Sequence, residues 1–290
     1  MKLLSTAFGV LLAISTLAQD DQIADGNFHL DKEYTVSPTG TIDLSLSDAK
    51  VYITGATTET AHVRIDREVE RRGITFGQEE FSIDVNNSDG NLRIRERSYS
   101  RNSGIIGYYY ERYEVKIDVP EGVSLIVKGD DGDFFIKNVN GSIEIDVDDA
   151  DVDLVSCRGT RFRFKLDDGD LSMDRGRGSL DIDIDDGDVN IRNASFKEVI
   201  ANLDDGDLVI ETSLVENGDY RIYAQDGLVS MTILEGGGEF SIRHDDGRVV
   251  TDSDFEVIQK TENFMKVSLN SGSAKVNIKA DDARVRLFKD

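Results

Sequence analysis

A short turn motif recurs through the second half of the chain at a nearly constant interval. It consists of an apolar-x-apolar segment, the residues Asp-Asp-Gly-Asp, and a second apolar-x-apolar segment. Counted at its Gly or Ala position, the motif falls at 132, 150, 169, 187 and 206, in steps of 18, 19, 18 and 19 residues. Weaker copies are centred on Gly227, Gly247 and Ala283. Such a period indicates one supersecondary unit that stacks repeatedly on the next.

Each unit combines two short strands with a tight bend between them. Ile143, Ile145 and Val147 alternate with acidic residues, which is the period of a strand with one buried face. The alternation changes parity across the motif, because Val147 and Val152 are an odd number of residues apart. A bend at Asp-Asp-Gly explains this change, since Gly accepts a positive φ and Asp bonds its own backbone.

The repeat predicts an all-β fold, and specifically a single-stranded β-solenoid with about 19 residues per coil. An antiparallel β-sandwich is the alternative, because short strands at similar spacing also occur in that class. The near-identity of the turns favours the solenoid, since successive hairpin turns of a sandwich lie at opposite ends. We therefore expect the Asp-Gly corners to lie one over another along a single edge of a rod.

The N-terminus has the pattern of a secretory signal peptide. Lys2 is the only charged residue before Asp20, and an apolar run between them ends with small residues at 16 and 18. The predicted divisions are a signal peptide (1–18), an exported lead (19–34), divergent first coils (35–119) with a Tyr/Arg-rich insert (97–113), and the regular repeat (120–290). The last two are expected to form one continuous domain.

The charge balance limits the partners. The chain has 57 acidic and 33 basic residues, a net charge of -24, and so should repel nucleic acid and anionic membranes. No second apolar stretch is long enough to span a bilayer in the mature chain. Cys157 is the only cysteine, so no internal disulfide is expected. We expect an unidentified protein or glycan as partner, and a location in the periplasm, at the cell surface or outside the cell.

Three features carry a family resemblance. They are the strand-turn-strand opening at 40–55, the strand at 113–123 that ends in Val-Pro-x-Gly, and the run of Gly-Asp-apolar-x-Ile turns. Over residues 35–290 the chain resembles the putative-adhesin family of bacterial β-strand-repeat proteins, a family of unknown function. The resemblance implies a β-repeat fold and assigns no catalytic residue. The Ser-Gly-Asp turn that is usual in that family is replaced in this chain by the more acidic Asp-Asp-Gly-Asp.

Stacked Asp corners would place like charges about one coil apart. Two carboxylates at ~4.8 Å repel by roughly 1 kcal/mol in water, so the repulsion needs relief from turn N–H groups, salt or bound cations. A solvated edge with Asp as turn former is the favoured interpretation. A calcium ladder is the sharper hypothesis, and calcium is the only cofactor considered. Its candidate ligands are Asp130, Asp131, Asp133, Asp148, Asp149, Asp151, Asp167, Asp168, Asp170, Asp185, Asp186, Asp188, Asp204, Asp205 and Asp207.

Tyrosine and arginine are concentrated in the insert at 97–113. Both residue types are enriched in binding hot spots, so Tyr108, Tyr109, Tyr110 and Tyr113 are the candidate interaction residues. The alternative is that these tyrosines are inward strand residues, or belong to a cap that covers the end of the rod.

The sequence therefore predicts an exported, non-enzymatic binding, adhesion-like or scaffolding protein of the cell envelope, tuned by cations if calcium binds. The alternative is a polysaccharide-active β-helix hydrolase or lyase, because paired carboxylates serve such chemistry. A catalytic site should interrupt a repeat, whereas the Asp pairs recur in every unit. Only the unit at 243–248 departs from the pattern, and no catalytic residue is predicted.

Overall fold

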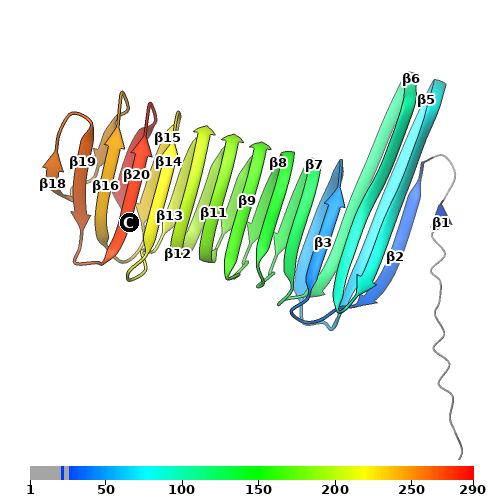
Figure 1. Cartoon of the computed structure of the whole chain (residues 1–290), viewed down its shortest axis with the longest axis horizontal. Coiled ribbons are helices and arrows are strands. Elements are labelled where there is room, and N and C mark those ends of the chain that lie inside the picture. Colours follow the sequence, from blue (N-terminus) through cyan, green and yellow to red (C-terminus); the bar gives the residue numbers. More distant parts are fainter. Residues whose placement is uncertain (1–20, 23–25) are drawn as a thin grey trace, which may run out of the picture.

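The computed structural model describes residues 21–22 and 26–290, with the backbone alone at 21–22, 78–79 and 99–103. The predicted signal peptide lies outside the described residues, as does part of the exported lead. The described chain consists of strands and turns that stack into an elongated rod (Figure 1). Within that part there is no helix of the length and apolar character needed to cross a membrane.

The middle of the rod is a stack of parallel coils. Leu125, Ile143, Phe162, Leu180 and Val199 pair in succession, at offsets of 18, 19, 18 and 19 residues. Parallel pairing confirms the β-solenoid-like class, and the antiparallel sandwich is wrong for this part. The strands are β7 (Ser124–Lys137), β8 (Ile143–Val155), β9 (Arg161–Asp168), β10 (Leu171–Asp174), β11 (Arg177–Asp186), β12 (Val189–Asp205), β13 (Asp207–Thr212), β14 (Asp219–Ala224) and β15 (Leu228–Ile233).

The core is a column of inward side chains that continues from coil to coil. Ile145, Phe164, Ile182 and Ala201 follow one another in register and are all buried. Each fully buried Val, Leu, Ile or Phe contributes about 1.5–3 kcal/mol relative to exposure. Because each coil contacts only its neighbours, this column is what holds the rod together.

The Asp-Gly corners lie one over another, as the sequence predicts. Gly169, Gly187 and Gly206 have φ values of +122°, +149° and +138°. A Cβ atom at any of them would lie 2.1–2.4 Å from the carbonyl oxygen of the corner below. Glycine is therefore required at these corners by both the dihedral angle and the approach of the next coil.

The N-terminal end differs from the expected coils. β3 (Thr41–Leu46) and β4 (Ala49–Ala56) do form a coil, which pairs in parallel with β7. By contrast, β5 (Thr60–Ser88) and β6 (Asn91–Pro120) form one long antiparallel hairpin. β6 also pairs in parallel with β3 and β4, while β2 (Phe28–Thr35) and β1 (Asp21–Gln22) add antiparallel strands. The prediction of divergent coils over 35–119 is thus wrong for β5, which pairs antiparallel, whereas both ends of β6 do stack in parallel on the first coil.

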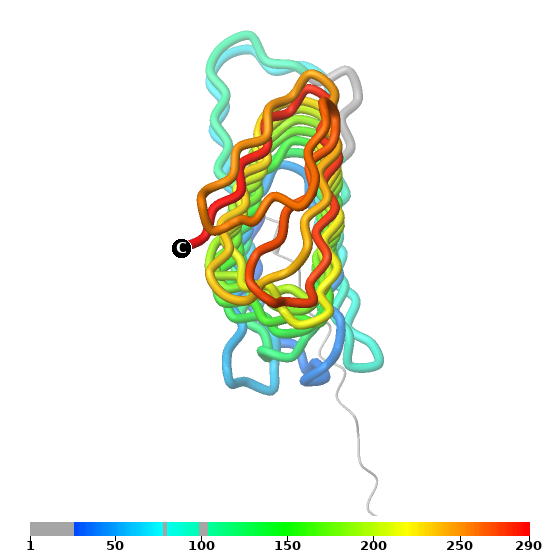
Figure 2. The backbone as a smooth tube through the Cα atoms, turned by 90° about the vertical axis from the view of Figure 1, so that its left-hand side faces the viewer, coloured from blue at the N-terminus to red at the C-terminus, as the bar shows by residue number. Residues whose placement is uncertain are grey.

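The middle of this hairpin extends past the stacked corners, where the other coils simply bend (Figure 2). We call this extension, residues 68–82 and 97–112, the arch. The predicted Tyr/Arg-rich insert is therefore one strand of a paired ribbon and not a separate loop, because its residues 97–101 and 104–113 pair with β5.

The C-terminal end is stacked out of sequence order. Its strands are β16 (Gly238–His244), β17 (Val249–Thr251), β18 (Glu256–Lys260), β19 (Phe264–Leu269), β20 (Ala274–Ala280) and β21 (Arg284–Lys289). β20 pairs with both β14 and β16, and β21 with both β15 and β17. The last coil of the sequence therefore lies between the two preceding ones. The predicted regular order to residue 290 is wrong here: Ala283, not Gly227, lies beside Gly247.

Candidate functional site

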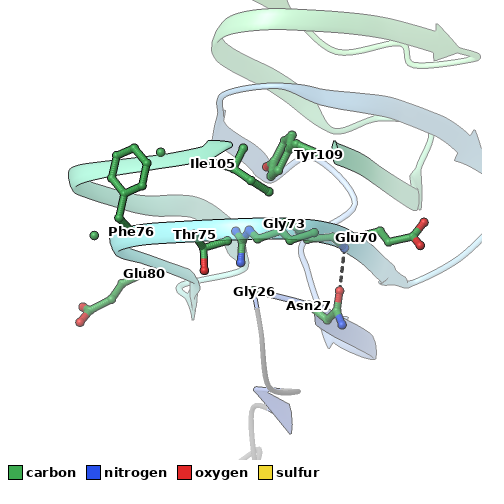
Figure 3. Close-up of a pocket in the computed structure, with 13 residues that line it drawn as sticks. Gly26, Asn27, Glu70, Gly73, Thr75, Phe76, Glu80, Ile105 and Tyr109 are labelled. Carbon is green, nitrogen blue, oxygen red and sulfur yellow. Dashed lines mark hydrogen bonds between the residues drawn. The ribbon is translucent and has the colours of Figure 1, made fainter. Parts of the chain in front are cut away.

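The arch is fixed to the N-terminal segment at its base. Arg67 is 4% exposed, and its Nε lies 2.5 Å from Oε1 of Glu111. Its Nη1 donates to the carbonyl oxygen of Gly26 over 2.7 Å, and the amide of Val69 donates to Oδ1 of Asn27 over 2.7 Å. Gly26 and Asn27 lie beneath the arch in Figure 3. A paired, buried guanidinium with a second hydrogen bond holds this geometry firmly.

An aromatic cluster lies just inside this base. The rings of Phe28, Phe81 and Tyr113 meet edge to face, with centroids 5.7 and 5.5 Å apart, and the Arg67 guanidinium lies 4.2 Å from the Phe81 centroid. Tyr113 is 6% exposed, and burial raises the pKa of its hydroxyl. Tyr113 is therefore a core residue, and the prediction that it belongs to an exposed recognition surface is wrong.

The upper part of the arch exposes large apolar side chains. Tyr108 and Tyr110 point to one face because they are two residues apart, and Tyr109 points to the other. Ile106 shares the first face, as does its cross-strand partner Ile74. We call these four residues, Ile74, Ile106, Tyr108 and Tyr110, the apolar face; they are 68%, 68%, 50% and 49% exposed.

The opposite face of the arch borders a hollow of about 970 Å³ (Figure 3). Arg71, Thr75, Ile105 and Tyr109 are among the residues that line it. The Arg71 guanidinium lies 5.7 Å from the centroid of the Tyr109 ring, and the Tyr109 hydroxyl donates to Glu111. Tyr109 is thus held by cation-π and hydrogen-bond contacts, whereas Tyr108 and Tyr110 face outward.

The structure brings the exposed tyrosines of the arch together with residues that the sequence pattern did not single out. Ile74 and Phe76 come from the β5 strand of the arch, and Ile106 precedes the tyrosines in β6. A signal was present in the glycines: Gly73 pairs with Gly107, and extending the hairpin outward from its turn at Asp89 and Gly90 would have placed them within one residue of each other.

The aspartates of the corners form continuous columns along one edge of the rod. In one column, Asp131, Asp149, Asp168, Asp186 and Asp205 pair in register. In another, each side chain binds the next coil. Oδ1 accepts the amide N–H of the following Asp over 2.9–3.0 Å, in the pairs Asp151–Asp170, Asp170–Asp188 and Asp188–Asp207. The fourth residue of the motif therefore links coils, which gives it a structural role independent of any ion.

Lysines neutralise part of this edge. Lys50 Nζ lies 2.6 Å from Asp133, and Lys165 Nζ lies 3.1 Å from Asp167. Asp48 lies near the arch. Partial burial, and next the negative charge of Asp131, raise the pKa of its carboxyl. Among the described side chains, no group of three or more His, Cys, Asp or Glu is arranged to hold a metal ion. The calcium ladder stays a prediction.

The unit that breaks the repeat is also a stacked corner. His244 donates its amide to the carbonyl oxygen of Asn263 over 3.1 Å, and Asp245 donates to that of Asp281 over 3.2 Å. These bonds tie the corner to the neighbouring strands.

Comparison with known proteins places the fold. No curated protein matches the chain significantly. A "putative adhesin" from Bacteroides fragilis is 15% identical with a TM-score of 0.51, over 90% of this chain and 97% of that one. A "putative cell adhesion protein" from Clostridium sporogenes is 14% identical with a TM-score of 0.29, over 90% and 100%. A "putative lipid binding protein" from Parabacteroides distasonis is 11% identical with a TM-score of 0.38, over 91% and 97%.

At these identities the likeness concerns the fold alone, and of these three structures only the one from Bacteroides fragilis is similar enough to support it. A family model also matches most of the chain. The match runs over residues 39–287, from the first coil through the arch to the intercalated last coil. The chain belongs to the Toastrack DUF4097 family, in agreement with the adhesin-like resemblance of its turns.

Proposed function

We propose that the protein is an exported, non-catalytic binding protein with an adhesion-like role at the cell envelope. Its rod, with coils of about 19 residues, is the scaffold and its arch is the contact surface. One observation carries this proposal. Of the eleven large apolar side chains exposed in the described residues, six lie on the arch: Ile74, Phe76, Ile106, Tyr108, Tyr109 and Tyr110. Such a concentration of exposed apolar and aromatic side chains marks an interaction site.

The chemistry of the apolar face favours a protein as partner. Two isoleucines and two tyrosines cover it, and Arg72 lies 5.8 Å from the Tyr108 ring centroid while pairing with Glu70. Aliphatic side chains gain more from an apolar protein surface than from a sugar ring. The surrounding acidic rod favours a neutral or basic partner over an anionic one. Binding to a neutral glycan is the other outcome that the test below distinguishes.

Two further parts of the proposal concern location and cations. The names of the adhesin-like neighbours support a position at the cell surface, and the signal-peptide pattern at 1–18 supports export. The columns of Asp along the rod support stiffening by calcium, because bound cations would offset repulsion between carboxylates one coil apart. Calcium would then act on the scaffold and not at the arch.

The test compares two double variants for binding. Tyr108→Ser with Tyr110→Ser removes the aromatic half of the apolar face, while Val257→Ser with Ile258→Ser removes exposed apolar side chains at the other end of the rod. Labelled proteins are applied to intact bacterial cells, to an array of envelope proteins and to a glycan array. We expect the first variant to lose binding and the second to keep it. Equal binding by both would contradict the proposal, and loss confined to the glycan array would identify a glycan as the partner.

A further inference from the structure

The intercalated last coil suggests an interaction that goes beyond the proposed function. β20 lies between β14 and β16, and β21 lies between β15 and β17. In this position the coil buries a set of small and medium apolar side chains: Ala274, Val276, Ile278, Ala280, Ala283, Val285 and Leu287. The last coil thus fills a slot between two coils that precede it in the sequence.

The two coils that border this slot match each other. Val276 pairs with Tyr220 on one side and with Phe240 on the other, and Val285 pairs with Val229 and Val249. The offset across the slot is therefore 240 - 220 = 20 residues in one sheet and 249 - 229 = 20 in the other. Because both offsets agree, the coil at 238–251 has the register to stack directly on the coil at 219–233.

The side chains also agree with such direct stacking. Tyr220 would meet Phe240, and Ile222 would meet Ile242, each pair being buried and of similar size. If the last coil were released, the coil at 238–251 could therefore stack directly on the coil at 219–233. Two packings of one sequence that share most of their contacts form a bistable element.

The connection that carries the last coil is short and exposed. Residues 270–273 join β19 to β20, and all four are exposed. Asn270 has a φ of +52° and donates to the carbonyl oxygen of Gly236 over 2.9 Å, and Ser273 Oγ accepts the amide of Asn217 over 2.9 Å. Few hydrogen bonds thus hold this connection, and a short hinge of this kind favours exchange of the segment beyond it.

We propose that the last coil, residues 274–289, exchanges between copies of this chain, so that one copy donates it to the slot of a second copy. The slot in the second copy is lined by the same residues as the slot that the coil fills in its own chain. Two copies that exchange their last coils therefore keep every strand pairing and every buried contact. The partner is therefore a second copy of this protein, joined end to end at the C-terminal end of the rod. A copy that has donated its coil closes its own slot by direct stacking or accepts another coil.

The test uses the full chain with single cysteines placed across the slot. Arg221 and Asn277 are adjacent partners of β14 and β20, and both side chains are exposed. Adjacent strands are about 4.8 Å apart, which is within reach of a disulfide. One population carries Arg221→Cys and a second, of different mass, carries Asn277→Cys, both with Cys157→Ala. They are mixed at high concentration, oxidised, and analysed by mass spectrometry.

The matched control mixes Arg163→Cys with Asp181→Cys, which are adjacent partners of β9 and β11 within the rod. We expect a covalent heterodimer, sensitive to reductant, from the first mixture and only background from the control. A double variant, Arg221→Cys with Asn277→Cys, oxidised before mixing, should lose exchange between differently tagged copies. Absence of the heterodimer, or equal yields in the two mixtures, would overturn the proposal.

Discussion

Replacing Gly187 with alanine tests whether the corners are as closely stacked as the structure shows. The residue has a φ of +149°, which costs a residue with a Cβ about 1–3 kcal/mol. The added Cβ would also lie 2.1 Å from the carbonyl oxygen of Gly169, so the adjoining coil would have to move. Overpacking of this kind costs typically about 1–3 kcal/mol. We therefore expect Gly187→Ala to lower the free energy of unfolding by about 2–6 kcal/mol.

Ala150 provides the matched control, since it occupies the equivalent corner without a positive φ. We expect Ala150→Gly to cost only about 0.5–1 kcal/mol, from the added freedom of the unfolded backbone. Urea unfolding followed by circular dichroism measures both variants, and hydrogen exchange at the amide of Asp188 reports whether the loss is local. A Gly187→Ala variant as stable as the wild type would refute the stacking described here.

Three more predictions concern the acidic edge. Asp170→Ala should lower stability by about 1–2 kcal/mol in urea unfolding, because it leaves the amide of Asp188 without its acceptor. Asp170→Asn keeps an acceptor while it removes a charge, so its stability should be close to that of the wild type. Equal losses in the two variants would contradict the role of this side chain as a link between coils. Millimolar calcium should raise the melting temperature, and a chelator should reverse the rise; an unchanged curve would remove the calcium ladder. Asp48 has a raised pKa, so its ionised form is disfavoured in the folded state; this penalty falls as the pH drops through that pKa and is gone below the pKa of the unfolded chain. Asp48→Asn should therefore stabilise the protein at neutral pH and lose this advantage in acid, and a benefit that did not depend on pH would contradict the account.

The corners could be predicted from the sequence because their chemistry is local. The Gly of each Asp-Asp-Gly-Asp motif marks a positive φ, and the constant step fixes which of these corners lies on which. The stacking of Gly169, Gly187 and Gly206 follows directly from that step. Alternation of Ile143, Ile145 and Val147 likewise predicted which side chains would be buried, and all three are.

The order of the last coils could not be predicted, because the competing neighbours look alike. Tyr220 and Ile222 can be followed by Phe240 and Ile242 or by Val276 and Ile278 with the same polarity pattern. The observed order depends on long-range pairing, including the antiparallel strand β19 that covers β16 from the other side. Periodicity carries no information about that choice.

The candidate site was predicted only in part, because composition identifies residues of one strand and not their partners on another. Tyr108, Tyr109 and Tyr110 stood out by composition, and the structure exposes all three. Their neighbours Ile74 and Phe76 come from β5, so only the hairpin register links them to the tyrosines. Tyr113 belongs to the same sequence cluster but lies below the arch, where burial and not composition decides its role.

Disulfide trapping of successive corners measures the vertical stacking of the coils most directly. In a Cys157→Ala background, cysteine pairs are placed at Asp131 and Asp149, at Asp149 and Asp168, and at Asp168 and Asp186, which are neighbours in register. Parallel coils about 4.8 Å apart predict that all three pairs form intramolecular disulfides. Failure of these pairs, together with cross-linking of Asp131→Cys to Asp168→Cys, would place successive turns at opposite ends and contradict the solenoid.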